Sequence, residues 1–160
     1  MRPLVEVIRD KIEECGVVSF ARFMERALYE PKLGYYETTV KVGRDGDFYT
    51  NTSVGPLFGE LLAFQFAEWM EGENEAVKVV EVGAHDGTLA ADMLSHWREH
   101  WPVLLERLEY CLAEPSAKRR MWQVKSLEAC VDRVRWVDDI GELGESSVCG
   151  VVFCNELLDA

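Results

Sequence analysis

The residues best suited to chemistry in this sequence form one short stretch, Glu81-Val82-Gly83-Ala84-His85-Asp86-Gly87. An apolar run that begins at Val77 leads into it, and a helical pattern of apolar residues follows between Leu89 and Trp97. Strand, tight turn and helix in this order are the opening unit of a parallel α/β sheet. Ligands bind such sheets beyond the carboxyl ends of the strands. The turn therefore predicts a ligand site.

The residue types in this turn narrow the chemistry of the ligand. A triphosphate-binding loop needs a Lys after its last glycine, and none follows Gly87. A dinucleotide loop needs glycine where His85 stands, and Glu81 would repel a pyrophosphate. A carboxylate at a strand end suits a cationic ligand such as S-adenosyl-L-methionine, and the Glu-x-Gly-x-x-x-Gly spacing is similar to motif I of class I methyltransferases. An ordinary turn without a ligand is the alternative. The residues expected at this cofactor are Glu81, Gly83, Ala84, His85 and Gly87.

Polar residues also follow three further predicted strands, residues 108–113, 134–137 and 148–154. In a parallel sheet the carboxyl ends of these strands meet at one edge. The acid Glu114 would accept hydrogen bonds from two ribose hydroxyls, as in other adenosine-binding α/β folds. A carboxylate favoured by a helix dipole is the alternative for this residue. The expected contacts are Glu114 and Pro115 at the ribose, Asp139 and Ile140 at the adenine, and Asn155 at the fourth strand end, where Glu156 follows.

A loop at residues 43–50 carries three charges, two glycines and two aromatic residues. Glycines allow backbone shapes that other residues cannot adopt. Such a loop can cover a pocket and place Asp47 or Tyr49 against a ligand, whereas a plain surface turn is the alternative. The loop residues expected to contact the cofactor are Gly46, Phe48 and Tyr49.

Composition limits the partners of the protein. The 160 residues carry a formal charge of −12 and no basic run, which argues against nucleic acid and against a membrane surface. No apolar segment is long enough for a transmembrane helix or a signal peptide. The five cysteines include no Cys-x-x-Cys pair, and we expect reduced, mostly buried thiols rather than metal ligands. A bacterial-type cytoplasmic location is expected.

The chain is expected to divide into a helical N-terminal extension, residues 1–75, and the first part of a cofactor-binding domain, residues 76–160. Helices are predicted from Pro3 to Glu14 and from the N-cap Ser19 to Glu30. Phe20 and Phe23 in the second helix are expected to be core residues. A third helix, capped by Thr52 or Ser53, should extend to Met70, and Pro102 should interrupt the helical pattern after the first strand.

The motifs together resemble the MidA family, a family of arginine methyltransferases that includes a mitochondrial complex I assembly factor. The Gly-Asp-Phe-Tyr-Thr loop and the Asn-Glu-Leu-Leu-Asp-Ala segment carry this resemblance most specifically. The matching segments are Ser19-Phe20-Ala21-Arg22-Phe23-Met24, Gly34-Tyr35-Tyr36, Gly43-Arg44-Asp45-Gly46-Asp47-Phe48-Tyr49-Thr50, Gly55-Pro56-Leu57-Phe58-Gly59, Glu81-Val82-Gly83-Ala84-His85-Asp86-Gly87, Glu114-Pro115-Ser116 and Asn155-Glu156-Leu157-Leu158-Asp159-Ala160.

The resemblance implies a doubly wound, Rossmann-like class I methyltransferase sheet and transfer of methyl groups to arginine nitrogens of a protein substrate. A guanidinium is a poor nucleophile, so a carboxylate must orient it and accept its proton. Glu156 is the candidate for this role, with Asp47 behind it. Relative to the family the chain is expected to be truncated after strand four, which would leave an apolar strand edge open to homodimer formation.

Two functions from other classes stay open. One is a nicotinamide-dependent oxidoreductase, against which Glu81 and the missing middle glycine count. The other is a non-catalytic assembly or binding module that retains the methyltransferase fold. No metal site is predicted.

Overall fold

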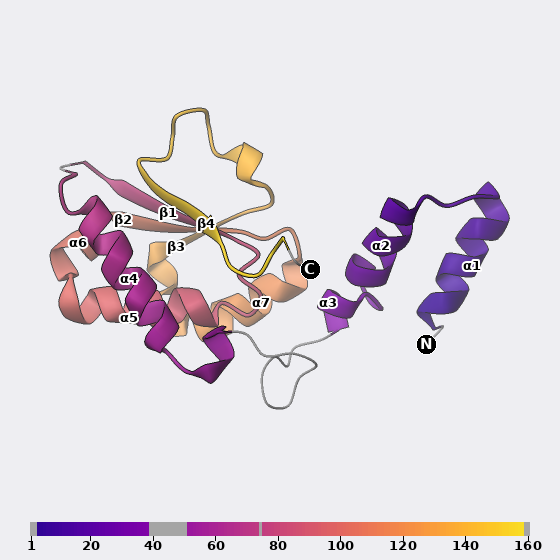
Figure 1. Cartoon of the computed structure of the whole chain (residues 1–160), viewed down its shortest axis with the longest axis horizontal. Helices are drawn as coiled ribbons and strands as arrows, with labels where there is room; N and C mark the ends of the chain where they lie inside the picture. Colours follow the sequence, from indigo (N-terminus) through magenta and orange to yellow (C-terminus); the bar gives the residue numbers. More distant parts are fainter. Residues whose placement is uncertain (1–2, 39–50, 74, 159–160) are drawn as a thin grey trace. The chain divides into compact units, whose positions relative to one another are not determined.

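The computed structural model describes residues 3–38, 51–73 and 75–158, and the chain forms two compact units, residues 1–48 and 49–160 (Figure 1). The first unit contains α1 (Leu4–Cys15), α2 (Phe20–Tyr29) and the single turn α3 (Tyr35–Thr38). The Ser19 hydroxyl caps α2 by accepting a hydrogen bond from the Arg22 N–H at 3.4 Å, so both helices lie where the sequence predicts them. The core role expected for Phe20 and Phe23 is wrong, because these side chains are 75% and 40% exposed. An amphipathic pattern identifies an apolar face but not what covers it.

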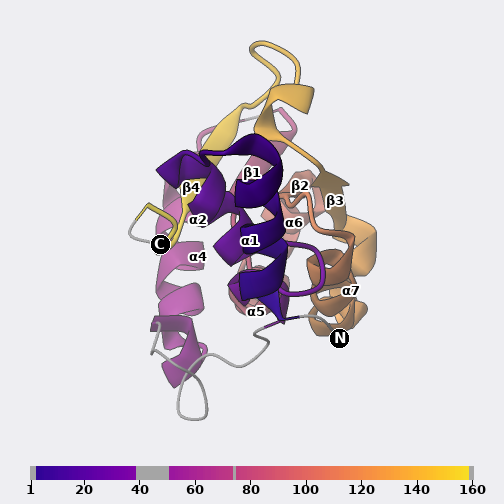
Figure 2. The ribbon, with the colours of Figure 1, turned by 90° about the vertical axis from the view of Figure 1, so that its right-hand side faces the viewer.

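The second unit is built on a four-stranded, entirely parallel sheet. Its strands are β1 (Val77–Val82), β2 (Leu108–Ala113), β3 (Val134–Val137) and β4 (Gly150–Cys154). They lie in the order β3-β2-β1-β4 (Figure 2). This order confirms the α/β sheet and places the fourth strand beside the first. β4 begins two residues later than predicted, at Gly150, where a Cβ would meet the Lys78 carbonyl oxygen at 2.2 Å.

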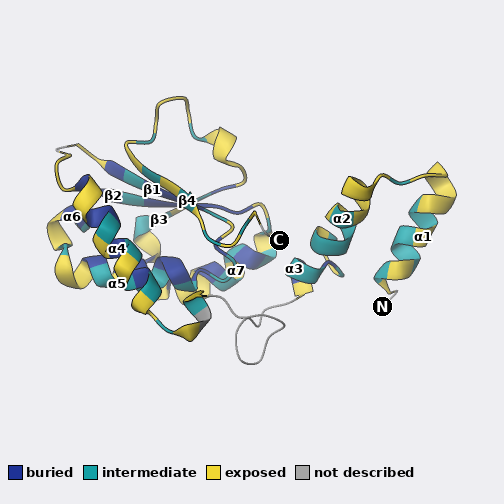
Figure 3. Cartoon of the chain, in the orientation of Figure 1, coloured by how far each residue is buried: buried dark blue, intermediate teal, exposed yellow. Residues whose placement is uncertain are grey.

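Four helices lie along one face of this sheet: α4 (Leu57–Met70), α5 (Thr88–His100), α6 (Pro102–Glu106) and α7 (Ala117–Ser126) (Figure 1). Two of them are joined by a buried hydrogen bond of 2.7 Å, which the Trp97 indole N–H donates to the Ala63 carbonyl. Figure 3 shows the buried residues concentrated in the strands and the sheet-facing sides of these helices. The remaining short helices are η1 (Asn51–Val54), η2 (Glu128–Arg133) and η3 (Ile140–Glu142).

One of two sequence predictions about helix ends is wrong. The N-cap of α4 is Pro56, which provides no side-chain hydrogen bond, whereas Thr52 and Ser53 belong to η1. The break predicted at Pro102 is confirmed, because α5 ends at His100 and Pro102 begins the separate short helix α6. A proline needs no hydrogen bond from its nitrogen at the first helical position, so the same residue that ends one helix can begin the next.

The α4 helix belongs to the core of the second unit. Ala63 and Ala67 are fully buried there, in one cluster with Val79 of β1 and Met93 of α5. The division expected at residue 75 stays a prediction about the domain organisation of the protein. Within the described residues, however, α4 packs as one of the layers that support the sheet.

The five cysteines are all free. Cys111 and Cys130 are buried, whereas Cys15, Cys149 and Cys154 are exposed. The expectation that most of them are buried is therefore wrong. Cys154 follows the apolar run of β4, but β4 lies at one side of the described sheet and is covered less than β1 or β2.

The strand register aligns the carboxyl ends of all four strands. Val82 of β1 pairs with Ala113 of β2 and with Cys154 of β4, and Ala113 pairs with Val137 of β3. The next residue after each strand therefore starts its turn at the same level of the sheet. These residues are Gly83, Glu114, Asp138 and Asn155.

Candidate cofactor-binding edge of the sheet

The turn after β1 has a backbone that two glycines make accessible. Gly83 has φ 77° and is exposed, and Gly87 has φ 82° at the N-cap of α5. A Cβ on Gly83 would meet the Leu157 Cδ1 atom at 2.8 Å, and a Cβ on Gly87 would meet the Gln123 Cα atom at 3.2 Å. Between them His85 also has a positive φ of 48°. The turn is therefore sterically tight, and a side chain at Gly83 would collide with Leu157.

The acid in this turn supports the start of α5. Asp86 Oδ1 accepts a hydrogen bond of 3.0 Å from the Thr88 backbone N–H. Burial opposes ionisation of Asp86, but hydrogen bonds from His85 and Thr88 outweigh it and lower the pKa of this carboxyl below its ordinary value. A charged Asp86 therefore stands at the N-terminus of α5, where the helix dipole favours it.

Glu81 is the acid that the sequence places beside the cofactor, and it is 2% exposed. Its Oε2 accepts a hydrogen bond of 2.7 Å from the Tyr110 hydroxyl of β2. Burial raises the pKa of Glu81 to about 7, although the Tyr110 hydrogen bond lowers it and the nearby Asp86 charge raises it further. Glu81 therefore lies inside the helix-covered core, and its contact with a cationic ligand stays a prediction.

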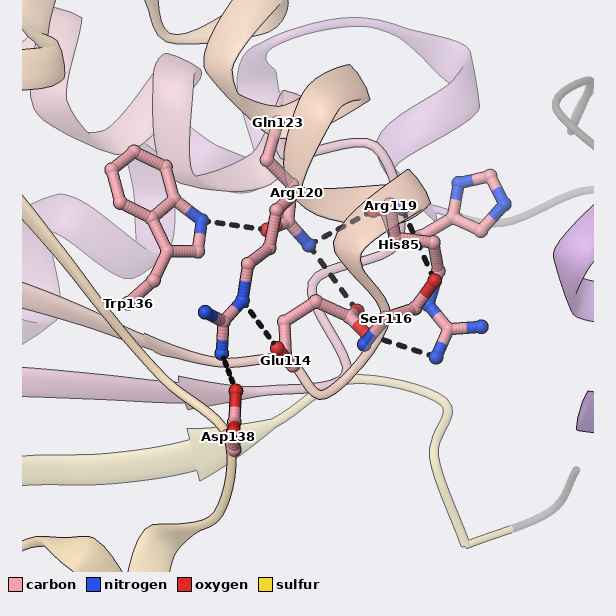
Figure 4. Close-up of polar contacts among 8 residues, drawn as sticks. All are labelled: His85, Glu114, Ser116, Arg119, Arg120, Gln123, Trp136 and Asp138. Carbon is pink, nitrogen blue, oxygen red and sulfur yellow. Dashed lines mark hydrogen bonds and ion pairs between the residues drawn. The ribbon is translucent and has the colours of Figure 1, made fainter. Parts of the chain in front are cut away.

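Glu114, at the end of β2, is 1% exposed and fully engaged by its own chain (Figure 4). Its Oε1 accepts a hydrogen bond from the Ser116 backbone N–H at 2.9 Å and pairs with the Arg119 guanidinium at 2.8 Å. Its Oε2 accepts a longer hydrogen bond of 3.3 Å from the Gln123 side-chain amide. Ser116 is the N-cap of α7, so the Glu114 carboxylate lies at the start of that helix. Its position is compatible with both interpretations, a ribose acceptor and a carboxylate at a helix end.

The residues after β3 make mainly local hydrogen bonds. Asp139 is the N-cap of η3, and its Oδ1 accepts a hydrogen bond of 2.7 Å from the Gly141 N–H. Ile140 is 43% exposed. Arg120 bridges this turn to the end of β2, since its guanidinium pairs with Asp138 and donates to the Glu114 carbonyl. An adenine contact of Asp139 and Ile140 stays a prediction.

Glu156 follows β4 with a positive φ of 49° and an exposed side chain. Its Oε1 accepts a hydrogen bond of 3.4 Å from the backbone N–H of Asn51, 105 residues earlier in the chain. A non-glycine residue in this conformation carries strain that is common at functional sites. Asn51 begins the part of the second unit that follows the glycine-rich loop. The loop residues themselves, Gly46, Asp47, Phe48 and Tyr49, lie outside the described residues.

The structure thus brings together at one edge the turns that hold most of the residues predicted for the site. Gly83, His85 and Pro115 have accessible atoms there, whereas Ala84 is 7% exposed and packs in the core. Gly87 is buried beneath α7. The roles assigned to these residues on a cofactor stay predictions.

Three polar residues at this edge were missed by sequence reasoning: Tyr110, Arg119 and Gln123. Arg119 and Gln123 are 8% and 0% exposed. They lie eight and four residues before the fully buried Leu127, and this spacing is the sequence signal that marks the inner side of α7. Met121 of the same helix is 65% exposed.

The described residues contain neither a metal-binding cluster nor a membrane-spanning helix. In these ranges no group of three or more His, Cys, Asp or Glu side chains is placed to hold a metal ion. No helix in the part of the chain that the structure describes has the length and apolarity to cross a membrane. The expected cytoplasmic location stays a prediction.

A family model and similar known proteins agree on one family, the methyltransferases. The model of a protein family described as "Putative S-adenosyl-L-methionine-dependent methyltransferase" matches residues 61–160. The protein arginine methyltransferase NDUFAF7, mitochondrial, of Bos taurus is 30% identical over 134 residues, which cover 82% of this chain and 30% of that protein. The same protein of Rattus norvegicus is 38% identical over 104 residues, which cover 64% of this chain and 24% of that protein.

A solved structure agrees with this family. The crystal structure of a candidate methyl transferase from Burkholderia thailandensis, bound to S-adenosyl-homocysteine, matches with a TM-score of 0.78 and 34% identity. The match covers 97% of this chain and 41% of that protein. The chain thus spans under half the length of the relatives it matches.

Proposed function

The chain belongs to this family of S-adenosyl-L-methionine-dependent methyltransferases, the MidA family, and from that premise we propose that the protein methylates an arginine of a protein substrate. The observation that supports this most is the pairing of a glycine turn with an acid at the ends of two neighbouring strands. Gly83 follows Val82 of β1, and Glu114 follows Ala113 of β2. Val82 and Ala113 are paired across the two strands. The arginine specificity rests on the names of relatives at 30–38% identity.

The residues present fit the cofactor of the family. The missing Cβ of Gly83 leaves an exposed backbone surface at the sheet edge, and no phosphate-binding Lys stands in the turn. In the proposal Gly83, Ala84, His85 and Gly87 bind the cofactor through the turn, with Glu81 beneath it. The other proposed contacts are Glu114 and Pro115 at the ribose, Asp139 and Ile140 at the adenine, and Gly46, Phe48, Tyr49 and Asn155 around the remainder. When bound, S-adenosyl-L-methionine supplies an electrophilic methyl group on its sulfonium.

The chain's own contribution to methyl transfer is positioning and proton acceptance. An arginine guanidinium is protonated at neutral pH and therefore nucleophilic only after losing a proton. In the proposal Glu156 orients this group and accepts its proton, with Asp47 as a second carboxylate. The exposed Glu156 side chain and the strained backbone that carries it support this role.

A calorimetric titration with S-adenosyl-homocysteine and, separately, with NADH tests the cofactor. Binding of the first and not of the second is expected, and the opposite result would favour an oxidoreductase. Incubation with labelled S-adenosyl-L-methionine and arginine-containing proteins, followed by hydrolysis to amino acids, tests the reaction and its product. Labelled methylarginine is the expected product.

The matched variants are Glu156→Gln and Glu145→Gln. Glu156→Gln should bind S-adenosyl-homocysteine as the parent does but lose transfer by about 100-fold or more, because it cannot accept the proton. The exposed Glu145 of the β3–β4 connection is the control, and its variant should transfer normally. Cofactor binding without any transfer in the parent would support a non-catalytic binding module instead.

A further inference from the structure

Gln123 of α7 connects three separate segments through one side-chain amide. The side chain is fully buried. Its Nε2 donates to the His85 carbonyl at 3.0 Å and to Glu114 Oε2 at 3.3 Å. Its Oε1 accepts a hydrogen bond of 2.8 Å from the Trp136 indole N–H of β3. Figure 4 shows these contacts converging on Gln123 from the turn after β1, the end of β2 and β3.

The orientation of this amide follows from chemistry. An indole N–H is a donor only, so the amide oxygen must face Trp136. The amide nitrogen then has to face the other two partners, both of which are acceptors. The Gln123 side chain is thus a donor toward the turn and toward Glu114, and it can serve both because the amide nitrogen carries two hydrogens.

The helix backbone is also held at a fixed distance from the turn. A Cβ on Gly87 would lie 3.2 Å from the Gln123 Cα atom and 3.3 Å from its Cβ and Cγ atoms. An added Cβ at Gly87 would therefore need the helix to shift by a few tenths of an ångström, so α7 packs closely on the turn. Movement of α7 away from this position would stretch the hydrogen bonds to His85 and Glu114 together.

We propose that Gln123 is the positioning residue of the cofactor site, which fixes the Glu114 carboxylate relative to the backbone of the Gly83–Gly87 turn so that one ligand can contact both. This inference rests on the proposed function. Gln123 contacts no reacting atom. It acts through Glu114, whose Oε2 it orients, and through the carbonyl of His85.

The first test is a double-mutant cycle in the whole chain, with S-adenosyl-homocysteine binding measured by calorimetry. Gln123→Met retains length and volume but removes every hydrogen bond of the amide. It should weaken binding about 10-fold, because the lost contacts include one to a charged group. In the Glu114→Gln background the same change should cost less than about twofold, since Gln123 acts through that carboxylate.

The second test is a pH profile that a space-filling role would not produce. Gln123→Glu keeps the shape but places a carboxylate against Glu114, so its affinity relative to the parent should be low at about pH 8. As the pH falls to about 5 the introduced carboxyl gains a proton and can again donate a hydrogen bond. The affinity of the variant relative to the parent should therefore rise. Gln123→Met should show no such recovery. The other titratable groups on the elements packed here include His85, Asp86, Glu114, Arg119, Arg120, Arg135 and Asp138, and they are common to both variants.

The control is Gln65→Met on α4, where the amide of Gln65 contacts the exposed Glu68 at 3.5 Å. It should bind as the parent does. If Gln123→Met does not fold, as judged by circular dichroism, Trp136→Phe replaces it in the cycle. That variant removes the donor that fixes the amide orientation and should weaken binding about threefold.

The outcomes separate this inference from the proposed function. If the parent chain does not bind S-adenosyl-homocysteine, both the proposed function and this inference are wrong. If the parent binds S-adenosyl-homocysteine and the Gln123→Met variant binds it equally well, this inference is wrong but the proposed function stands. Equal losses in the Glu114 and Glu114→Gln backgrounds would also overturn it, because Gln123 would then act independently of the carboxylate.

Discussion

The hydroxyl of Tyr110 donates a 2.7 Å hydrogen bond to the carboxyl of Glu81 between two neighbouring strands, and both side chains are almost completely buried. The burial of the two groups raises the pKa of each above its ordinary value, that of Tyr110 far above it. The acid of the first sequence motif is thus held by the core beneath the turn. Its protonation is coupled to the stability of the sheet.

Glu81→Gln should change the pH dependence of stability. The pKa of Glu81 is raised from 4.5 to about 7, so the folded parent holds a proton that the unfolded chain releases. This contribution to stability is complete below about pH 4.5 and is lost as the pH rises through about 7, by roughly 3 kcal/mol in total. The variant should lack this decline in urea unfolding measured between pH 4 and 8.

Tyr110→Phe is the companion variant for this prediction. It removes the hydrogen bond that lowers the pKa of Glu81, so the decline should move to higher pH. Parallel profiles for the parent and Glu81→Gln would show that Glu81 does not titrate in this range.

Gly83→Val should abolish S-adenosyl-homocysteine binding. Its side chain would occupy the space between the turn and Leu157, where even a Cβ comes within 2.8 Å, and the φ of 77° is unfavourable for a β-branched residue. Gly16→Val is the matched control, because Gly16 has a similar φ of 75° but no atom within 4 Å of the added Cβ. Calorimetry on both variants separates backbone strain from loss of the site. Normal binding by Gly83→Val would place the ligand elsewhere.

Glu114→Gln should weaken binding of S-adenosyl-homocysteine by roughly 1.5–3 kcal/mol, because a charge-assisted contact to the ribose is lost. Glu109→Gln is the control on the same strand, where the carboxylate lies near Lys78 and Arg135 at 3.7 and 3.6 Å. Calorimetry against the parent is the measurement. A change smaller than about 0.5 kcal/mol would support the helix-end interpretation of Glu114.

Arg119→Met should strengthen binding about fivefold. The Arg119 guanidinium lies 2.8 Å from Glu114 Oε1, an oxygen that a ribose hydroxyl would also need, so its removal frees one acceptor position worth about 1 kcal/mol. Arg120→Met is the control, because Arg120 contacts the Glu114 carbonyl and Asp138 instead of the carboxylate. Weaker binding by Arg119→Met would mean that the ion pair belongs to the ligand-binding conformation.

Val152→Lys should reduce self-association of the chain. β4 pairs with β1 on one side, and on its other side no strand of the described residues pairs with it. Val152 is 50% exposed there, and a charged residue at a sheet edge opposes pairing with another chain. Light scattering with size-exclusion chromatography should show a concentration-dependent dimer in the parent and in the control Val124→Lys on α7, but not in Val152→Lys. A parent that stays monomeric would contradict the prediction.

The order of strands and turns could be predicted from the sequence because its signals are local. Mainly apolar runs of four to six residues, a glycine turn after the first run and an acid directly after the second set the strands and their polar ends. A parallel sheet then brings those ends to one edge whatever the details of packing. The break at Pro102 followed from the sequence, whereas the cap of α4 did not, because helix ends fray and shift by one or two residues.

The partners of the buried polar groups were decided only by the tertiary structure. Tyr110 and Glu81 are 29 residues apart, and Gln123 and His85 are 38 apart. Arg119 reaches Glu114 because α7 turns its polar i, i+4 side toward the sheet edge. A buried polar group must find a partner wherever the fold brings one within reach. Sequence spacing determines which residues follow each strand, but the three-dimensional packing of α7 against the turn determines which of them meet.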